Sequence, residues 1–556
     1  MYATTNPLST KVATLLTLLA AAHLNAATIY VDDDATGAND GSGWSDAFTD
    51  LQSALDAAVV ADQIWVAAGT YTPSAETTPG DDRTATFQLV SGVAVYGGFA
   101  GTENPQTFML QDRDLNANVT TLSGDLAGDD GPAFAHNAEN AYHVVTASGT
   151  DTSAILDGFV ITGGNADGVP SHFGGGGMYN EDGSPTVRHC KFDTNAALLA
   201  GGGVVNTGTA LPTFSNCAFS NNEAAMGGAV YNGNDVSTFK DCSFNANASS
   251  GHAGAMYNGG SDPDLIRCSF TDNTAGSQGG AIYNDSSNAT LLDCVLRTNS
   301  SLGDGGAINN WDGSNPTLTD CLLAGNKTDD AGGAIHSSIG SDTTLINCTV
   351  VENEAAGVGG GLSNDDDSSP FLYNTILWGN QAAGLTNEAA QIHLDVGTPV
   401  IDHCCVQSWT GLLGGVGNIG LDPLFVNAPA GNYQLLSGLS PSIDAGNNAV
   451  SGLPSTDLGG NTRLVDDGAV PDTGTGTPPI IDMGAYEAQG DCNVNGVPDE
   501  TETDTDGDGV IDACDLCPLN PALTVPGLCG CGAALTVFLS IVGLGIMRPS
   551  TRRRIS

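Results

Sequence analysis

A pattern of about 26 residues repeats along the middle of the chain and limits its fold more than any other feature. A cysteine returns seven times at intervals of 25 to 27 residues, with an apolar residue two positions later and an asparagine five positions later. The seven are Cys190, Cys217, Cys242, Cys268, Cys294, Cys321 and Cys348. A tandem repeat of this length indicates stacked units, since one unit is too small to bury a core alone.

The apolar runs inside each repeat have strand length, as in residues 279–299, GGAIYNDSSNATLLDCVLRTN. They span three to five residues and are bounded by Gly, Asn, Asp and Ser, which is typical of strands joined by tight turns. Each repeat has room for three short strands but not for a packed helix. The repeats therefore predict an all-β parallel β-helix, with one repeat per coil and coils stacked roughly 4.8 Å apart.

The repeated residues are expected to have separate roles in a coil. Glycine pairs such as Gly305-Gly306 supply the positive φ of a tight corner. The cysteine and the apolar residue two positions later are predicted to face inward. Two asparagine columns, one after the glycines and one after the cysteines, are expected at turns, where their amides form ladders between coils.

For the cysteine column we expect buried, reduced thiols that act as small hydrophobic residues. Disulfides between neighbouring coils and metal binding are the alternatives. Stacked, parallel Cβ vectors fit disulfide geometry poorly.

Residues 174–380 resemble the repeats of polymorphic outer membrane proteins. The resemblance rests on GGAI at residues 279, 305 and 332, and on FDTN, FSNN, FNAN and FTDN at residues 192, 219, 244 and 270. It implies a right-handed β-helix displayed on a cell surface, with a role in adhesion. The chain lacks room for that family's C-terminal barrel, so this part does not carry over.

The segments beside the repeats resemble two further groups. The opening at Thr28, with a short amphipathic helix around Leu51 and Leu55 that would cap the solenoid, is similar to pectin-lyase-like β-helix proteins. SPSIDAGN from Ser440, DLGGNTR from Asp457 and DMGAYE from Asp482 resemble the end of choice-of-anchor domains. This resemblance implies a secreted or surface-attached protein.

Charge and the N-terminus indicate the compartment. With 14 basic and 63 acidic residues, the formal net charge is −49, which disfavours nucleic acid and anionic membrane surfaces as partners. Lys11 followed by the apolar residues 12–22 reads as a secretory signal, cleaved near Ala26 or Ala27. A buried helix is the alternative. The protein is therefore expected outside the cytoplasm, where disulfides are permitted.

Two acidic stretches after residue 490 fit twelve-residue calcium loops and resemble thrombospondin type 3 repeats. Oxygen ligands alternate along each loop, and a glycine permits the bend. The predicted calcium ligands are Asp491, Asn493, Asn495, the Val497 carbonyl, Asp499 and Glu502 in the first loop, and Asp504, Asp506, Asp508, the Val510 carbonyl, Asp512 and Asp515 in the second. A disordered acidic linker is the alternative.

The C-terminus combines cysteines, an apolar run and arginines. Five cysteines, an odd number, lie between residues 492 and 531, where disulfides, an anchoring role or a zinc site are open. The apolar residues 533–547 and the arginines after them resemble bacterial C-terminal sorting tails, which predicts attachment at the cell surface (outer membrane). A core helix is the alternative.

The predicted organisation has six parts: a signal peptide (1–26), a cap with irregular coils (27–150), regular coils (151–380), C-terminal coils with a choice-of-anchor-like ending (381–489), a calcium module (490–531) and a hydrophobic, Arg-rich tail (532–556).

Catalysis has weak support in the sequence, and we assign no catalytic or cofactor-binding residue beyond the calcium ligands. Basic residues are scattered through the coils, and His252 and His336 are expected to be tolerated surface residues. Acidic residues follow the glycine strand in most coils, either as turn residues or as a carboxylate stripe. They are Asp182, Asp235, Asp262, Asp285, Asp312, Asp342 and Asp365.

The sequence thus favours a secreted, cell-surface β-helix protein that serves adhesion or surface architecture through glycan or protein partners, with membrane contact only through its tail. The alternative is an extracellular protein that binds or degrades polysaccharide, as a lyase or glycoside hydrolase. The fold alone does not decide between them.

Overall fold

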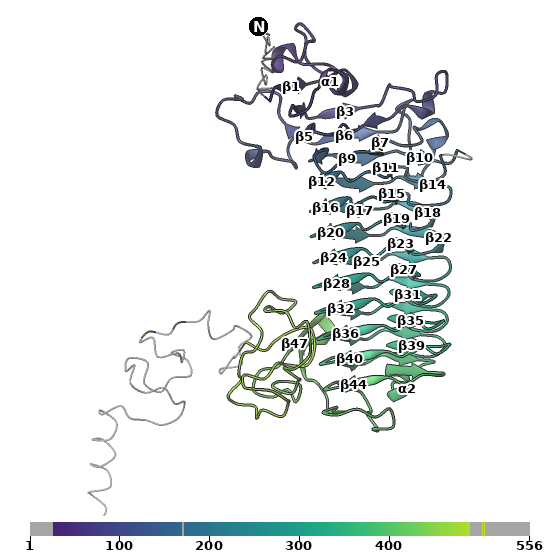
Figure 1. Ribbon diagram of the computed structural model, residues 1–556, viewed down its shortest axis with the longest axis vertical. Helices are drawn as coiled ribbons and strands as arrows, with labels where there is room; N and C mark the ends of the chain where they lie inside the picture. Colours follow the sequence, from purple (N-terminus) through teal and green to yellow (C-terminus); the bar gives the residue numbers. More distant parts are fainter. Residues whose placement is uncertain (1–25, 169–171, 490–502, 504, 506–556) are drawn as a thin grey trace, which may run out of the picture.

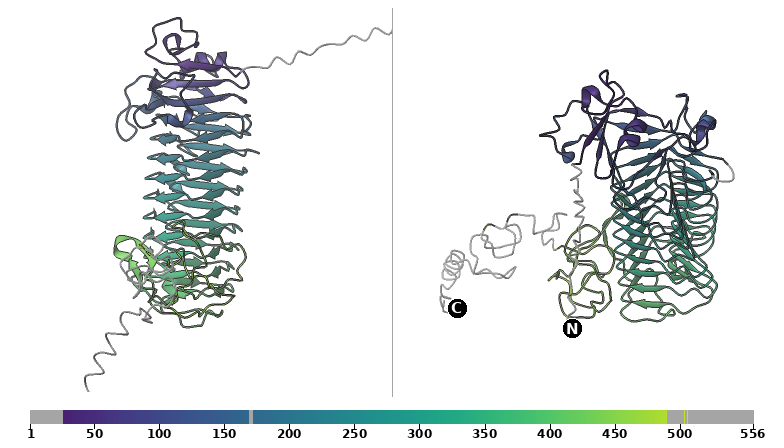
Figure 2. Two further views of the ribbon diagram at one scale, coloured as in Figure 1. Left: turned by 90° about the vertical axis from the view of Figure 1, so that its left-hand side faces the viewer. Right: turned by 45° about the horizontal axis from the view of Figure 1, so that its top comes forward.

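A computed structural model describes residues 26–168, 172–489, 503 and 505. The chain forms a straight column of stacked coils (Figures 1 and 2). Four parallel sheets run along the described column, with 13, 12, 9 and 11 strands, here named sheets A, B, C and D in the order in which a coil visits them. The fold is therefore the predicted all-β parallel β-helix, with very little helix.

The strand bounds follow the sheets. Sheet A contains β1 (Thr28–Val31), β2 (Gln63–Ala67), β5 (Ala94–Phe99), β8 (Ile155–Asp157), β12 (Thr186–Arg188), β16 (Thr213–Ser215), β20 (Thr238–Lys240), β24 (Asp264–Ile266), β28 (Thr290–Leu292), β32 (Thr317–Thr319), β36 (Thr344–Ile346), β40 (Phe371–Tyr373) and β44 (Val400–Asp402). Sheet B contains β3 (Gly69–Tyr71), β6 (Thr120–Ser123), β9 (Val160–Thr162), β13 (Lys191–Asp193), β17 (Ala218–Ser220), β21 (Ser243–Asn245), β25 (Ser269–Thr271), β29 (Val295–Arg297), β33 (Leu322–Ala324), β37 (Thr349–Val351), β41 (Ile376–Trp378) and β45 (Cys405–Val406). Sheet C contains β10 (Asn165–Ala166), β14 (Ala196–Ala197), β18 (Glu223–Met226), β22 (Ala248–His252), β26 (Thr274–Ala275), β30 (Ser300–Ser301), β34 (Lys327–Thr328), β38 (Glu354–Ala355) and β42 (Gln381–Ala382). Sheet D contains β4 (Phe87–Gln88), β7 (Val145–Thr146), β11 (Met178–Glu181), β15 (Val204–Thr207), β19 (Val230–Gly233), β23 (Met256–Gly259), β27 (Ile282–Asp285), β31 (Ile308–Trp311), β35 (Ile335–Ser337), β39 (Leu362–Asn364) and β43 (Ile392–Leu394).

A regular coil therefore has four strands, where the repeat length alone suggested three. The additional strand arises because the chain bends at each cysteine. Between β28 and β29, for example, Asp293 has a φ of 55°, and the bend divides one predicted strand into two of three residues. The cysteine thus occupies a corner instead of a strand position, but it still faces inward.

The predicted core column fills the solenoid. Phe192, Phe219, Phe244 and Phe270 are fully buried, and their rings stack with centroids 4.5 to 5.0 Å apart. The seven repeat cysteines are buried and free, as expected, and burial raises the pKa of thiols such as Cys294. At Gly305 φ is 71°, and a Cβ there would overlap the carbonyl oxygen of Ile308, which explains the glycine corner.

Both asparagine columns form the predicted amide ladders. From Asn195 to Asn380, each buried Asn donates from Nδ2 to Oδ1 of the Asn in the next coil, at 2.9–3.1 Å. Gln391 closes this ladder by accepting from Asn380 at 2.8 Å. The second ladder joins Asn180 to Asn310 in the same way. Polar turns therefore stay buried because every coil provides a partner for the next.

The two ends of the column differ. At the N-terminal end, α1 (Leu51–Ala57) has Asp50 as its N-cap and buries Leu51, Ala54 and Leu55 in the continuous core. Near the other end lies the short helix α2 (Glu388–Gln391). The coils finish at β45. We call the following residues 407–489 the C-terminal segment, which contains the antiparallel pair β46 (Phe425–Asn427) and β47 (Asn432–Leu435).

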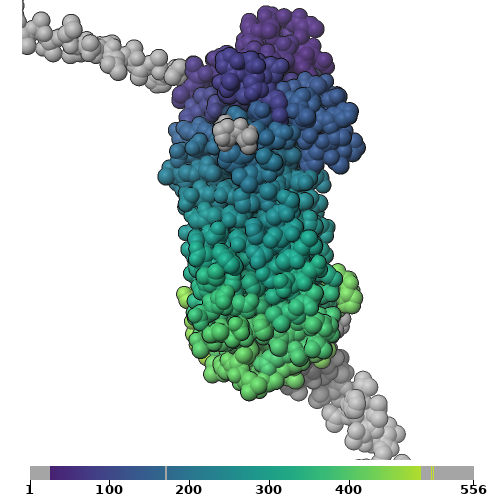
Figure 3. Space-filling model, turned by 90° about the vertical axis from the view of Figure 1, so that its right-hand side faces the viewer, coloured from purple at the N-terminus to yellow at the C-terminus, as the bar shows by residue number. Residues whose placement is uncertain are grey.

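The C-terminal segment packs back on the outside of the coils (Figure 1). Tyr433 and Phe425 cover Leu322, Val351 and Trp378 on the outer face of sheet B. On the side of the column away from this segment the coils form a continuous surface (Figure 3).

The predicted signal peptide, calcium loops and tail lie outside the described residues, apart from the single positions 26, 503 and 505. Among the described residues, no helix is long and apolar enough to cross a membrane. The division into six parts stays a prediction.

Candidate functional site

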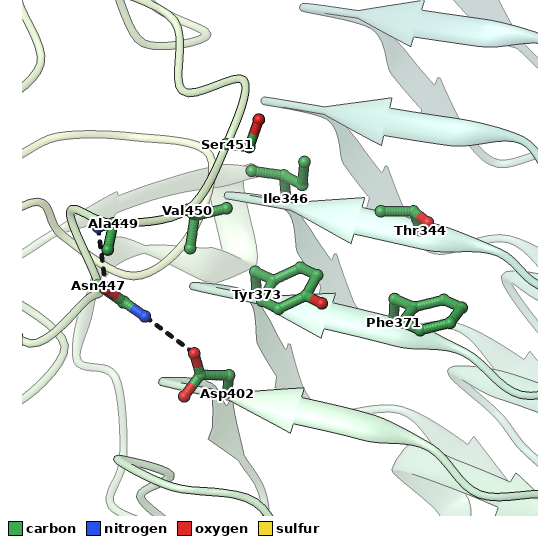
Figure 4. Close-up of a pocket in the computed structure, with 9 residues that line it drawn as sticks. All are labelled: Thr344, Ile346, Phe371, Tyr373, Asp402, Asn447, Ala449, Val450 and Ser451. Atoms are coloured by element: carbon green, nitrogen blue, oxygen red, sulfur yellow. Dashed lines mark hydrogen bonds between the residues drawn. The ribbon is translucent and has the colours of Figure 1, made fainter.

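A groove with a volume of about 570 Å³ lies between the outer face of sheet A and a loop of the C-terminal segment (Figure 4). Strands β36, β40 and β44 form its floor, and residues 447–451 form its wall. The groove is lined by Thr344, Ile346, Phe371, Tyr373, Asp402, Asn447, Ala449, Val450 and Ser451.

Strand alternation directs the floor residues outward. The middle residues Leu345, Leu372 and Ile401 are buried in the core, so the residues on either side of each point outward, and all of these except Val400 line the groove. The parallel register places Ile346, Tyr373 and Asp402 in one column. Aromatic, aliphatic and acidic side chains thus lie side by side on consecutive coils.

Hydrogen bonds hold the wall against the floor. Asn447 donates from Nδ2 to Oδ2 of Asp402 at 2.9 Å (Figure 4). Its backbone N–H donates to Oδ1 of Asn374 at 2.7 Å, and Nδ2 of Asn374 donates to the Asn447 carbonyl at 3.2 Å. The groove is therefore formed before any ligand arrives.

An imidazole links the floor to a second loop. His403 Nδ1 lies 2.8 Å from Asp402 Oδ1, and His403 Nε2 lies 2.9 Å from the hydroxyl of Thr475. His403 is buried, and both ring nitrogens have partners. This Asp–His–Thr arrangement fixes the orientation of the Asp402 carboxylate at the edge of the groove.

Two of the three motifs of the C-terminal segment converge on one buried charge cluster. Arg463 from DLGGNTR lies 2.5 Å from Asp320 of the coils and 3.4 Å from Glu487 of DMGAYE, and all three side chains are at most 1% exposed. Asp482 is fully buried beside them, where burial and the charge of Glu487 raise its pKa. Buried carboxylates outnumber the single arginine, so the cluster favours bound protons.

This cluster predicts that part of the stability is lost as pH rises. Burial raises the pKa of Asp320 from 3.8 to about 7, although Arg463 acts in the opposite direction. The folded protein therefore holds a proton that the unfolded chain releases between about pH 4 and pH 7. Stability conferred by Asp320 is present below this window and declines as pH rises through it.

The variant Asp320→Asn keeps an acceptor for Arg463 but removes this titration. We expect its unfolding free energy to decline less between pH 4 and pH 7, by up to about 1.4 kcal/mol per pH unit. Denaturant unfolding of both proteins at pH 4.5 and 7.5 measures the difference. Burial lowers the pKa of His143 to about 4, so His143 makes stability increase with pH. This contribution is the same in both proteins and cancels in the comparison. Identical pH dependence would contradict the prediction.

The acidic residues after the glycine strands act mainly as turn residues. Asp182, Asp262 and Asp342 accept backbone N–H groups from the next coil, at 2.6–2.8 Å. Asp235 is buried and bonded to Ser237 and Ser261. Among the described residues, two groups of three carboxylates lie close enough together to hold a cation. Neither group contains a member of this series.

The histidine expectation is wrong for His336, which is buried. Its ring bridges Asn309 at 2.9 Å and Asp365 at 3.1 Å, because neighbouring coils place hydrogen-bonding groups on both sides of it. His252 is partly buried against the ring of Tyr283, with centroids 4.6 Å apart.

Sequence reasoning missed the groove, although one signal was present. The outward positions that carry Thr317 and Thr319 in β32 carry Phe371 and Tyr373 two coils later. The stacking of coils does not require this change from hydroxyl to aromatic side chains at outward positions. The change therefore indicates a local function.

Comparison with family models agrees with the fold. A family model described as a right-handed β-helix region matches residues 202–381, so the solenoid is a right-handed parallel β-helix. Among solved structures, pectate lyase Pel9A is 14% identical, with a TM-score of 0.40 over 83% of this chain and 96% of that chain. A rhamnogalacturonan lyase is 12% identical, with a TM-score of 0.23 over 72% and 90%. No curated protein matches the chain.

Proposed function

We propose that this protein binds a neutral polysaccharide in the groove. The observation that carries the proposal is the joint presence of Phe371 and Tyr373 with the hydrogen-bonding groups of Asp402 and Asn447 in one preformed groove. A sugar ring offers an apolar C–H face and a rim of hydroxyls. Aromatic side chains with a few placed polar groups match both parts.

Charge selects among polysaccharides. The groove lining includes Asp402 but no Lys or Arg, and the whole chain has a formal net charge of −49. A polymer of uronic acids would meet repulsion here. Neutral glycans are therefore the favoured class.

The shape of the molecule suits an extended ligand. Sheet A continues beyond the groove for many coils, and its outward positions at Thr317 and Thr290 lie in register with Thr344. A polymer chain that enters the groove therefore meets further hydroxyl groups on the next two coils, roughly 4.8 Å apart.

Binding is better supported than cleavage. Elimination from a polysaccharide needs a base that reaches the sugar, and hydrolysis needs an acid and a second carboxylate or a water. The groove lining offers a single carboxylate, which is already hydrogen-bonded to Asn447 and His403. We therefore propose recognition without turnover.

We also propose that the binding takes place at a cell surface and serves adhesion or surface architecture. The support comes from the sequence alone: the signal-like N-terminus, the calcium-loop pattern and the apolar, Arg-rich tail. Calcium remains the proposed cofactor of residues 490–531, and the outer membrane the proposed location.

The variant Tyr373→Ala is expected to weaken glycan binding about tenfold or more, the scale of a central aromatic contact. The control Asn245→Ala removes an exposed side chain at the end of β21, on sheet B and away from the groove, and should bind as the wild type does. Full-length protein is titrated with neutral and acidic polysaccharides, and the polymer is checked for shortening. If Tyr373→Ala bound the glycan as tightly as the control, the groove would be rejected as the binding site. Shortening of the polymer would show that the protein is an enzyme and would overturn recognition without turnover.

A further inference from the structure

Three carboxylates from distant parts of the C-terminal segment meet beside the groove wall. Asp444 lies in the SPSIDAGN motif, and Asp466 and Asp472 lie in the loop that follows DLGGNTR. One oxygen from each lies within 4.8 Å of the other two. Among the described residues, none of the three forms a salt bridge with Lys, Arg or His.

Asp444 provides an independent sign of a ligand. It is 0% exposed, and its Oδ1 has no hydrogen-bond partner. Its Oδ2 already accepts the backbone N–H of Asp467 at 3.3 Å. A buried carboxylate oxygen without a partner is costly, so the fold leaves Oδ1 available for a group that supplies positive charge.

The residues around Asp444 increase its need for a positive charge. Burial, followed by the charges of Asp466, Asp472 and Asp467, raises the pKa of Asp444 to about 7. The neighbouring Asp467 is engaged elsewhere, because its carboxylate accepts from Ser437, Gly438 and Ala469. The three remaining carboxylates repel one another unless a cation joins them.

We propose that Asp444, Asp466 and Asp472 bind a calcium ion. Carboxylate oxygens are the ligands of hard cations, and the variable geometry of calcium accepts three protein oxygens with water in the other positions. Asp466 and Asp472 are exposed, which gives those waters access. This site is separate from the loops predicted after residue 490.

The ion connects to the groove through short covalent and hydrogen-bonded paths. The Asp444 carbonyl accepts from the backbones of Thr473 and Gly474 at 2.9 and 3.0 Å. The next residue, Thr475, contacts His403, and its carbonyl accepts from Asn448 of the wall at 2.8 Å. Calcium would thus fix the wall, and on the basis of the proposed function it would strengthen glycan binding.

The test uses full-length protein in which Asp491→Asn, Asp504→Asn and Asp506→Asn weaken the predicted C-terminal loops. Calcium is titrated by calorimetry into this background, and into the same background with Asp466→Asn and Asp472→Asn. We expect the second protein to lose one bound ion per chain. A matched control, Asp125→Asn with Asp129→Asn, alters another acidic group and should lose none. An unchanged number of ions after Asp466→Asn and Asp472→Asn would overturn the site.

A second measurement guards against misfolding and separates the two proposals. Without added substitutions, EDTA should make residues 464–474 more sensitive to protease, and calcium should reverse this; no change would oppose the site. Glycan affinity is then measured with calcium and with EDTA. Equal affinity would remove the link to the groove. A protein that binds calcium at this site but binds no glycan would reject the proposed function and leave the cation site standing.

Discussion

Replacing Arg463 by alanine is expected to lower the free energy of unfolding by about 3–5 kcal/mol, the scale for breaking a buried ion pair from one side. The side chain of Arg463 is 1% exposed, and its partners Asp320 and Glu487 are 0% exposed. Without the guanidinium, Asp320 and Glu487 stay buried with no cation, and each must keep an uncompensated charge or take up a proton. The pair also joins residues 143 positions apart, so its loss loosens the C-terminal segment from the coils.

Denaturant unfolding of full-length Arg463→Ala measures this effect, with proteolysis of the C-terminal segment as a second readout. The matched control is Arg267→Ala, which breaks a 2.7 Å pair with Asp241 whose side chains are 47% and 33% exposed. An exposed pair contributes at most about 1 kcal/mol. Similar losses in the two variants would show that the buried cluster adds nothing beyond an ordinary surface contact.

The second large effect is expected in the asparagine ladder. Asn247 accepts from the backbone N–H and Nδ2 of Asn222 at 3.1 and 2.9 Å. It donates from Nδ2 to the Phe219 carbonyl at 2.9 Å and to Oδ1 of Asn273 at 3.0 Å. Asn247→Ala leaves several buried groups without partners, each costing about 1–3 kcal/mol, so we expect a loss of about 3–5 kcal/mol in total.

The same coil provides the control. Asn245 lies two residues earlier at the end of β21, where its side chain is exposed, and Asn245→Ala should change stability by no more than about 0.5 kcal/mol. Thermal and denaturant unfolding of the two variants compares buried with exposed asparagine in one turn. If Asn247→Ala proved as mild as Asn245→Ala, the ladder would be a packing feature without energetic weight.

The coil architecture could be predicted from the sequence because each contact in it joins one repeat to the next. Phe219 contacts Phe244, and Asn222 contacts Asn247, 25 residues apart. The repeat interval therefore gives the sequence separation of the contacting residues. The inward cysteines, the glycine corners and the amide ladders follow from this translation. The fourth strand did not follow, because the bend falls at the periodic cysteine, which the sequence pattern had assigned to the interior of one strand.

The groove and the carboxylate site required the tertiary structure. Tyr373 and Asp402 lie on neighbouring coils, but Asn447 reaches Asp402 from 45 residues away, and Arg463 reaches Asp320 across 143. The SPSIDAGN, DLGGNTR and DMGAYE motifs could be recognised in the sequence, but their spacing did not indicate that they fold back onto sheets A and B.

The sequence by itself thus determined the solenoid, since a repeated unit can bury its apolar face only against a copy of itself. The tertiary structure decided where that regularity is interrupted. The C-terminal segment is not a repeat, so its position depends on side-chain fit to one particular face of the coils, and that fit creates both the groove at Tyr373 and the acidic site at Asp444.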